Sequence, residues 1–576
     1  MLNNVVMFAN DFGLSSWHNH VARFAVFAIP IILAITLIII CTRQFHVLQQ
    51  NSYFAKRYVR NLKTMIGFKT IISLLVTVGI IAFVWSDMFY FRGAFNLPQE
   101  IYLLFRASGR DFMVSHGYLE SFVIALFFIG IIRAIYTIRK QKSSKKPLVF
   151  TARVKRMYVT LTVLQAGLIA MFLVFNWDLR ILFTIQALKL LFTPIEVIAV
   201  RFVNAPIERA INRYYVNDAK KILKSCEGMT IIGITGSYGK TSTKHFLGHM
   251  LESKFNVTIT PGSYNTTLGV VRTVREHLPP IADVFVVEMG AKVMGDIKEL
   301  AELAKPQIGI LTAIGPQHLD TMYTQENITK TKFELYDSVV ARDGLMFLNV
   351  DNEIIAGREN VVNSVKYGTN ADNGAGVYAD NIKIGAHGST FDIVNGERRI
   401  SVSTKLLGKL NILNIVAAAA VGMHLGLEDA DIVQAVATMP TVAHRLELKP
   451  FKNGSTLIDD SYNSNPVGCI EAANVLGSFE SKRKIAVTPG LVELGAEEFE
   501  ANRNFGAALA KNATDVILVG PKRSHPIRKG MIEAGFDENN LTIVTTFKDA
   551  LPLLDKMCDE DTVVLFENDL PDNYER

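Results

Sequence analysis

Long apolar segments fill the first two hundred residues of the chain, and shorter apolar runs alternate with polar stretches after them. Five segments in the first part are long and poor in charge: 24–41, 65–85, 119–138, 159–177 and 179–200. A helix needs about 20 apolar residues to cross the hydrocarbon core of a bilayer. No small-residue cleavage site follows the first segment, which argues against a removable signal peptide. The pattern predicts an α-helical membrane domain over residues 1–203, with about five transmembrane helices.

The charges between these segments predict how the chain crosses the membrane. The loop after the first segment carries one basic group, made of Arg43, Lys56, Arg57, Arg60, Lys63 and Lys69. The loop after the third carries a second group, made of Arg139, Lys140, Lys142, Lys145, Lys146, Arg153, Lys155 and Arg156. Cytoplasmic loops collect Lys and Arg, so both loops are expected inside. This puts the N-terminus outside and everything after residue 203 in the cytoplasm, with the lipid bilayer as a partner.

The overall charge and the cysteines exclude some other classes of protein. The net charge of +6 belongs largely to loops beside apolar segments, so we interpret it as a topology signal and expect no nucleic-acid partner. Four cysteines lie far apart and form no CxxC pair. They support neither a zinc ribbon nor a disulfide framework, and they favour a reducing compartment.

Two charged residues interrupt the fifth apolar segment. Lys189 and Glu196 are costly in lipid, and seven residues bring both to one helix face, where they would meet the other helices or mark a function. A tilted helix whose charged ends reach the membrane surface is the simpler interpretation.

Beyond residue 203 the pattern is that of an α/β protein. A connecting helix is expected over 204–228, followed by β-type runs at 230–234, 284–287, 308–312 and 346–349 with helical stretches between them. Such alternation predicts a parallel sheet. Short alternating runs between 376 and 408 predict a small antiparallel excursion, and the runs 485–487, 516–519 and 563–566 predict a smaller Rossmann-like sheet. We therefore expect a central domain over 204–438 and a C-terminal domain over 439–576.

A nucleotide phosphate loop opens the central domain. The first strand leads into Gly236-Ser237-Tyr238-Gly239-Lys240-Thr241-Ser242, and a helical stretch follows. Glycines let backbone N–H groups approach phosphate oxygens, and the helix N-terminus adds positive charge. Lys240 would reach the outer phosphates and the Thr241 hydroxyl would bind Mg²⁺. Ile234 stands where the general pattern has glycine, so the segment by itself also permits a chance match.

This loop resembles that of the Mur ligase family, which lacks the same glycine, and further motifs follow in the family's order. They are 287–291 (Val-Glu-Met-Gly-Ala), 315–319 (Gly-Pro-Gln-His-Leu), 332–334 (Lys-Phe-Glu), 349–351 (Asn-Val-Asp), 408–414 (Gly-Lys-Leu-Asn-Ile-Leu-Asn) and 444–447 (His-Arg-Leu-Glu). Leu410 replaces a histidine of the family pattern. The segments 459–466 (Asp-Asp-Ser-Tyr-Asn-Ser-Asn-Pro) and 492–495 (Val-Glu-Leu-Gly) are closest to the MurF branch.

The resemblance implies an ATP-dependent ligase with a central P-loop ATPase domain and a C-terminal Rossmann-like domain that closes over ATP. A substrate carboxylate would attack the γ-phosphate of ATP, and an amine would then attack the acyl phosphate. Lys240, His318, Lys332 and Arg445 are the implied catalytic residues. Mg²⁺ would be held by Thr241 and Glu288, and a second ion by His318 and a carbamylated Lys332.

The remaining site residues are also implied by the resemblance. Asn411 and Asn414 would hold the adenine, and Asp459 or Asp460 the ribose, beside Arg445. Asn265, Thr266, Asn463 and Asn465 would bind the substrates. Each has a structural alternative. His318 can be a hydrogen-bonded structural histidine, Lys332 a solvated helix lysine, Asn411 and Asn414 helix caps, Asn463 and Asn465 turn formers, and Arg445 a surface ion-pair partner.

The chain departs from the MurF pattern at both ends. The membrane domain occupies the space of the uridine-nucleotide domain, and residues 566–571 (Phe-Glu-Asn-Asp-Leu-Pro) replace a Lys-Gly-Ser stretch. We expect a multi-pass protein of a bacterial-type cell membrane that joins a muropeptide-type carboxylate, lipid-linked in our hypothesis, to D-alanyl-D-alanine or a related amine. The alternatives are a MurT-like or polyglutamate-type ligase with another amine, and a non-catalytic ATP-binding membrane scaffold.

Overall fold

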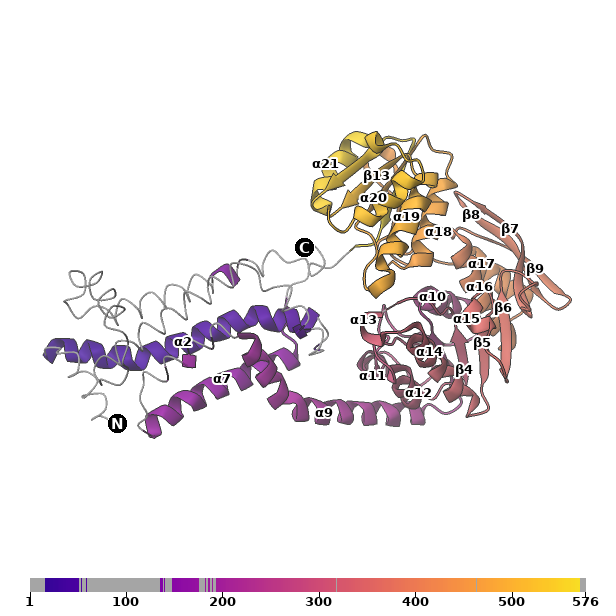
Figure 1. The fold of residues 1–576 in the computed structure, drawn as a ribbon. Helices are drawn as coiled ribbons and strands as arrows, with labels where there is room; N and C mark the ends of the chain where they lie inside the picture. Colours follow the sequence, from indigo (N-terminus) through magenta and orange to yellow (C-terminus); the bar gives the residue numbers. More distant parts are fainter. Residues whose placement is uncertain are drawn as a thin grey trace. The chain divides into compact units, whose positions relative to one another are not determined.

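The computed structural model describes residues 16–50, 53, 58–59, 135–137, 139, 148–175, 182, 185–186, 189, 193–317, 319–462 and 464–569 (Figure 1). The chain divides into two compact units, Met1–Ile211 and Asn212–Arg576. The predicted span 65–85, most of the span 119–138 and part of the span 179–200 lie outside the described residues, as do His318 and Asn463.

Three helices make up most of the described part of the first unit: α2 (Ser16–Gln50), α7 (Ala152–Val174) and the start of α9 (Thr193–Ser225). Within the described residues, two helical stretches are long and apolar enough to cross a membrane, Ile31–Gln50 and Ala152–Val174. They correspond to the first and the fourth predicted segments.

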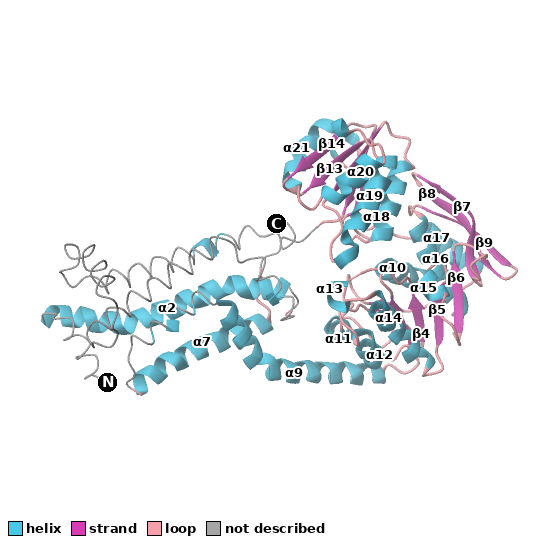
Figure 2. Cartoon of the chain, viewed as in Figure 1, coloured by secondary structure: helices cyan, strands magenta, loops and turns pink. Residues whose placement is uncertain are grey.

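Hydrogen bonds fix the relative direction of α2 and α7, which run side by side (Figure 2). The Gln49 side chain pairs with both backbone groups of Val149, at 2.9 and 3.0 Å. The Tyr158 hydroxyl donates to Thr42 Oγ1 at 2.6 Å. Residue numbers rise along one helix as they fall along the other, so the helices are antiparallel. The end of α2 and the start of α7 therefore lie at one level, as the predicted topology requires.

The two charges of the fifth segment lie together. Lys189 Nζ is 3.3 Å from Glu196 Oε1, and the Gln165 amide of α7 donates to Glu196 Oε2 at 3.4 Å. Glu196 thus faces a neighbouring helix, in agreement with the interpretation that the two charged residues meet the other helices.

A nine-stranded sheet forms the core of the central domain, in the order β2-β3-β1-β4-β5-β6-β7-β8-β9. Its strands are β1 (Thr230–Thr235), β2 (Val257–Ile259), β3 (Val284–Glu288), β4 (Ile308–Leu311), β5 (Leu345–Asn349), β6 (Ser364–Gly368), β7 (Val377–Gly385), β8 (Gly388–Asn395) and β9 (Arg398–Thr404). The strands from β2 to β7 pair in parallel, whereas β7, β8 and β9 are antiparallel. The predicted parallel sheet and its antiparallel excursion are confirmed.

Helices cover both faces of this sheet, as a parallel sheet requires. One face is covered by α10 (Lys240–Leu251), α16 (Lys409–His424) and α17 (Asp429–Ala437). The other is covered by α11 (Thr267–Glu276), α12 (Asp296–Ala304), α14 (Gln325–Val340) and the end of α9. The short helices α13 (Leu319–Met322) and α15 (Glu353–Ala356) complete the domain. Because helices bury both faces of the sheet, residues on both sides of each central strand are apolar, and the strand sequences are continuous apolar runs.

The C-terminal domain has a six-stranded sheet in the order β10-β11-β15-β12-β13-β14. Its strands are β10 (Glu447–Pro450), β11 (Thr456–Asp460), β12 (Arg483–Thr488), β13 (Asp515–Val519), β14 (Leu541–Val544) and β15 (Thr562–Glu567). All pairs are parallel except β10 with β11. Helices α18 (Pro466–Gly477), α19 (Glu498–Asn512) and α20 (His525–Glu533) pack on one face and α21 (Phe547–Met557) on the other.

Candidate functional site

The phosphate loop follows β1 and is held by the chain that follows β4. A Cβ atom on Gly236 would lie 2.1 Å from Thr312 Oγ1, so only glycine fits there. Gly239 has a left-handed φ of 79° and begins α10. The Ser237 amide donates to the Ala313 carbonyl at 2.6 Å, and its hydroxyl donates to the Gly315 carbonyl at 3.0 Å. The loop is thus shaped by contacts with a second strand end, and Ser242 is buried in the helix behind it.

The Lys240 amine is folded back onto this loop. It donates to the carbonyls of Gly236 and Ser237, at 2.6 and 3.1 Å. Burial lowers the pKa of Lys240 to about 8. The negative charge of Glu288 opposes this lowering, and the positive charge of Arg445 adds to it. The cationic groups of the phosphate loop and of the C-terminal domain are therefore close enough to repel, which is typical of a site built for an anion.

Glu288, at the end of β3, is the centre of a buried polar cluster. Its Oε2 accepts from Thr241 Oγ1 and from Lys244 Nζ, each at 3.1 Å, and its Oε1 accepts from the Asn265 amide at 2.9 Å. Burial alone would raise the pKa of Glu288, but the charges of Lys244 and Lys240 and the bond from Asn265 outweigh it and hold the pKa below its usual value. The carboxylate is therefore ionised in an almost fully buried position.

Sequence reasoning missed Lys244, the fully buried partner of Glu288. A signal was present, because Lys244 follows Lys240 by four residues and so faces the same side of α10. Thr241 and Glu288 supply the hard oxygen atoms that Mg²⁺ prefers, and they lie within hydrogen-bond distance of each other. The residues present thus fit one Mg²⁺ ion.

Lys332 lies inside α14 and is 2% exposed. Burial lowers the pKa of its amine well below the usual value, and the nearby charge of Lys240 adds to the lowering. The alternative of a solvated helix lysine is therefore wrong. Its motif partner Glu334 has a different task, because its carboxylate accepts from the amides of Gly295 and Lys298, at 2.9 and 2.8 Å, and so caps the start of α12.

The two asparagines of α16 are buried and do not cap their helix, whose N-cap is Gly408. Asn414 Oδ1 accepts from Thr243 Oγ1 at 3.0 Å, and a Cβ on Gly239 would lie 2.7 Å from the same atom. Asn411 donates to the Leu407 carbonyl at 2.8 Å. Asn414 therefore contacts the phosphate loop, and Asn411 braces its own helix.

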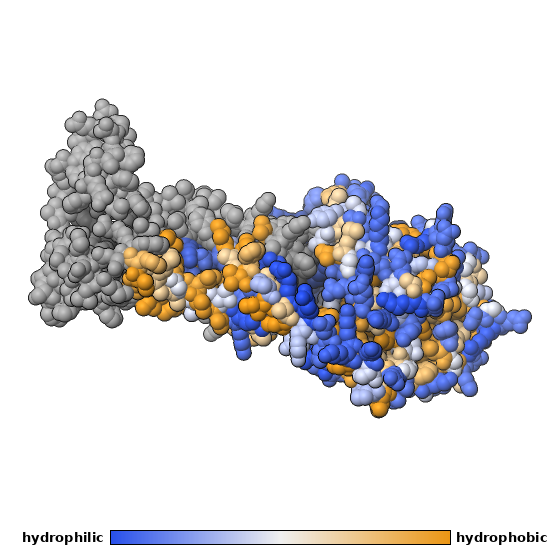
Figure 3. Space-filling view, turned by 90° about the horizontal axis from the view of Figure 1, so that it is seen from below, coloured by the Kyte–Doolittle hydropathy of each residue, from blue (hydrophilic) through white to orange (hydrophobic). Residues whose placement is uncertain are grey.

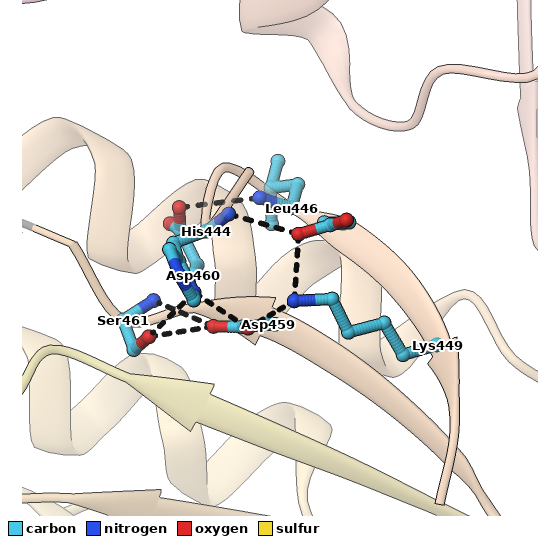
Figure 4. Close-up of polar contacts among 7 residues, drawn as sticks. His444, Leu446, Lys449, Asp459, Asp460 and Ser461 are labelled. Atoms are coloured by element: carbon cyan, nitrogen blue, oxygen red, sulfur yellow. Dashed lines mark hydrogen bonds and ion pairs between the residues drawn. The ribbon is translucent and has the colours of Figure 1, made fainter. Parts of the chain in front are cut away.

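Asp459, at the end of β11, accepts from several groups at once (Figure 4). Its carboxylate accepts from Lys449 Nζ at 2.8 Å and from Ser461 Oγ at 2.6 Å, and it lies 2.8 Å from His444 Nδ1. Burial would raise the pKa of Asp459, but these partners outweigh it and lower the pKa. Candidate metal-binding atoms of His444, Glu447 and Asp459 lie within 4.8 Å of one another. Lys449 bridges the two carboxylates and already supplies the cation.

The half-buried Asp460 and the buried Glu567 form a carboxyl pair beside Arg445. They are register neighbours on β11 and β15, and burial is the main cause that raises the pKa of both groups, while the charge of Arg445 opposes it. The Leu446 amide donates to Asp460 at 3.2 Å, and the Ser464 hydroxyl donates to Glu567. Arg445 lies over the Tyr462 ring, 4.9 Å from its centroid.

Two predicted substrate residues have structural tasks at helix starts. Thr266 caps α11 by accepting from the Gly269 amide, and Asn465 caps α18 by accepting from the amides of Val467 and Gly468. Asn265 instead lies beside Glu288. The Ser263 hydroxyl, just before it, hydrogen bonds to the Tyr462 hydroxyl of the C-terminal domain. The two domains thus meet next to Asn265 and Tyr462.

Comparisons with known proteins agree with this architecture. The Mur ligase middle domain matches residues 234–422, and the Mur ligase, glutamate ligase domain matches residues 444–567. The UDP-N-acetylmuramoyl-tripeptide–D-alanyl-D-alanine ligase of Bacillus subtilis (strain 168) is 27% identical over 341 residues, which are 59% of this chain and 73% of the relative. The ligase of the same name from Escherichia coli (strain K12) is 30% identical over 300 residues, 52% of this chain and 66% of the relative.

A solved structure has the same fold. The MurF ligase from Thermotoga maritima in complex with ADP has a TM-score of 0.55 at 23% identity, covering 62% of this chain and 80% of that chain. The chain spans about two thirds of the length of the Escherichia coli relative, and its first two hundred residues lie outside both family matches.

Proposed function

Because the chain belongs to the Mur ligase family through its middle and C-terminal domains, we propose that it is an ATP-dependent ligase that joins a carboxylate to an amine. The observation that carries the proposal is the phosphate loop, where the Lys240 amine lies on the loop carbonyls and the buried Glu288 accepts from Thr241. The named relatives are ligases that act on a muramoyl tripeptide and D-alanyl-D-alanine.

In the proposed reaction, a substrate carboxylate oxygen attacks the γ-phosphorus of ATP and ADP leaves. The acyl phosphate that results is attacked by the amine nitrogen, which loses a proton while inorganic phosphate leaves. The first step brings two anions together, so concentrated positive charge must stabilise it. Lys240 acts as a compact cation near the outer phosphates, and Arg445 offers a guanidinium that binds two phosphate oxygens. Repulsion between the two cations is relieved when the phosphates lie between them.

Mg²⁺ would be held by Thr241 and Glu288, and it would supply further positive charge to the phosphate oxygens. Lys244 then remains as the buried countercharge of the same carboxylate, 3.1 Å away.

Lys332 is suited to carbamylation. Because the pKa of Lys332 is well lowered, more of its amine is in the neutral, nucleophilic form than in an exposed lysine. Its nitrogen would form a bond to the carbon of CO₂ and release one proton to water, leaving a carbamate anion. The carbamate and His318 would then hold a second Mg²⁺, and the charge repulsion with Lys240 would become attraction.

The first unit would anchor the ligase in a bacterial-type membrane, with the end of α2 and the start of α7 on the cytoplasmic side. The antiparallel pairing of these helices and the basic residues at their shared level support this topology. We further propose that the carboxylate substrate is a lipid-linked muropeptide, because two helices long and apolar enough to cross a membrane precede the middle domain, where the family pattern has a uridine-nucleotide domain.

The identity of the amine has two candidates. The relatives' names favour D-alanyl-D-alanine. The pair of Asp460 and Glu567 favours another amine, because the MurF pattern has a lysine-containing stretch after its last strand and this chain has a buried acid. A site with less positive charge would bind a substrate carboxylate less well and a cationic or neutral amine better.

The test is phosphate release from ATP by the full chain in lipid nanodiscs, with products identified by mass spectrometry. The assay crosses UDP-linked and lipid-linked muropeptides with D-alanyl-D-alanine, single amino acids and diamino acids. We expect turnover with a lipid-linked acceptor. The K240M variant should abolish it. The K254M variant, which replaces an exposed lysine just beyond α10, should leave it unchanged. Turnover only with a UDP-linked acceptor would overturn the lipid-linked part. Full cellular function of K240M would favour the membrane scaffold over any ligase.

A further inference from the structure

Two arginines pair with one buried carboxylate in the first unit, and a third arginine lies close to them. Arg156 Nε lies 2.7 Å from Glu208 Oε1, and Arg153 Nε lies 3.8 Å from Glu208 Oε2. The Arg153 guanidinium stacks over the Tyr53 ring, 3.9 Å from its centroid, and Arg201 Nε donates to the Tyr53 carbonyl at 3.0 Å. Glu208 and Tyr53 thus hold the three guanidinium groups, which come from α7 and α9, in one place.

This arginine cluster (Arg153, Arg156 and Arg201) lies at one end of the apolar helices. Arg153 and Arg156 belong to the first two turns of α7, at the level that the Gln49 and Val149 bonds share with the end of α2. Asn204 of α9 donates to Thr160 at 2.9 Å, which keeps α9 at nearly the same level. A charged group at the end of a spanning helix lies where lipid headgroups meet water.

Apolar side chains close to these arginines in sequence face outward. Val149 is 61% exposed, Phe150 56% and Phe202 77%. Figure 3 shows hydrophobic side chains gathered on the described part of this unit, with hydrophilic ones next to them. Such a rim accommodates a hydrocarbon chain while the guanidinium groups bind a polar headgroup.

The charge of the cluster selects among headgroups. Three guanidinium groups and one carboxylate leave a net charge of two positive units among these four side chains. The side chains of Arg153 and Arg156 are 31% and 33% exposed, so a ligand can reach them. A phosphodiester carries one negative charge, whereas a pyrophosphate diester carries two and offers oxygen atoms to more than one guanidinium.

We propose that Arg153, Arg156 and Arg201 bind the pyrophosphate of a polyprenyl-type lipid at the membrane surface. The identification of that lipid as the carrier of the ligase's own carboxylate substrate rests on the proposed function; the binding does not. The arginine cluster would then hold the lipid anchor, while the attached headgroup extends into the water.

The test measures lipid binding by the full chain in zwitterionic nanodiscs, without ATP or amine, by native mass spectrometry. The probes are a polyprenyl pyrophosphate diester bearing an N-acetyl sugar, a polyprenyl monophosphate, phosphatidylglycerol and inorganic pyrophosphate. We expect the pyrophosphate lipid to bind at least tenfold more tightly than the other three. R201Q and R156Q should each weaken it roughly tenfold or more, since a hydrogen bond to a charged group is lost. The matched control is R209Q, which replaces an exposed arginine on α9, the helix of Arg201. It should leave the dissociation constant of the pyrophosphate lipid unchanged.

Equal binding of phosphatidylglycerol would mean that the arginines only attract anionic lipid, and equal binding of inorganic pyrophosphate would mean a site for a soluble ion; either result overturns the proposal. So does unchanged binding in both R201Q and R156Q. Nucleotide binding at the phosphate loop checks that each variant is folded. Because no turnover is needed, an inactive ligase that still binds the pyrophosphate lipid refutes the proposed function alone.

Discussion

The buried ion pair between Lys244 and Glu288 allows a sharp test of how the phosphate loop is supported. Their side chains are 0% and 1% exposed, and 3.1 Å separates Nζ from Oε2. In K244M, Glu288 keeps its bonds from Thr241 and Asn265 but loses its nearest countercharge. Removing one partner of a buried pair costs roughly 3–5 kcal/mol, because the other charge stays buried and uncompensated. We expect K244M to unfold on the order of 10 °C below the natural chain.

The dependence of this loss on pH follows from the pKa of Glu288. In the natural chain the pKa is held low, so the carboxylate contributes stability that is present above its unfolded value and lost as the pH falls through the folded value. In K244M the burial of Glu288 would dominate and raise the pKa of its carboxyl group. The group would then contribute stability only below its unfolded pKa, and that contribution would be lost as the pH rises. The difference in melting temperature should therefore widen from pH 5.5 to pH 8.

The assay is thermal unfolding of the full chain in nanodiscs, followed by intrinsic fluorescence at several pH values. The double variant K244M/E288Q removes both charges, and a glutamine oxygen can still accept from Thr241 and Asn265. It should recover most of the lost stability. K254M, which loses one exposed bond to the Gly426 carbonyl, should change stability by about 0.5 kcal/mol or less. A double variant as unstable as K244M, or a loss that does not vary with pH, would refute the reasoning.

Three further predictions concern the chemistry. K240M should lower phosphate release roughly 100-fold or more and abolish binding of a fluorescent ATP analogue, while circular dichroism stays unchanged. E567Q should raise the melting temperature increasingly from pH 5 to pH 8: burial raises the pKa of Glu567, so its favourable contribution is present below the unfolded pKa and lost as the pH rises. A melting difference that is flat with pH would count against this. Removal of dissolved CO₂ should lower turnover, and bicarbonate should restore it, because Lys332 would then lose and regain the carbamate that we propose. K330M, an exposed lysine two residues away, should respond to CO₂ as the natural chain does.

The sequence predicted the α/β architecture well because its strands are continuous apolar runs. The runs at 230–234, 284–287 and 308–312 coincide with β1, β3 and β4 within one or two residues. The positions of Lys240, Thr241 and Glu288 also followed from sequence, since the carboxyl ends of neighbouring parallel strands bring β1 and β3 to the same edge.

Other features depend on contacts between distant residues, which no local pattern reveals. Nothing around residue 567 predicts that its acid lies beside Asp460, because strand order places β15 between β11 and β12. The arginine cluster likewise needs Glu208 to meet Arg153 and Arg156 across some fifty residues of chain. Sequence reasoning found the basic loop and used it only for topology.

Several family motifs turn out to combine chemistry with architecture. Lys332 is buried near the phosphate loop, yet Glu334 caps α12. Asn349 donates to the Thr312 carbonyl. The hydroxyl of Thr312 is the atom that a side chain at position 236 would clash with. A motif residue can therefore matter because it fixes the loop, and substitution there should lower both stability and turnover. Substitution at Lys240 should lower ATP binding and turnover and leave stability largely unchanged.

The departures from the family pattern are then the places where we expect this chain to differ in function. Leu410 stands in the first turn of α16, where only its neighbours Asn411 and Asn414 retain polar side chains of that motif. Glu567 stands at the end of β15, fully buried, next to an acid that the pattern retains. Two carboxyl groups at neighbouring strand ends cannot both ionise easily, and burial raises the pKa of both. The lysine-containing stretch of the family pattern would instead add a positive charge to this region. Because the ATP-binding residues are kept and this charge is reversed, we expect the chain to differ from its relatives in the choice of amine and to resemble them in the activation of the carboxylate.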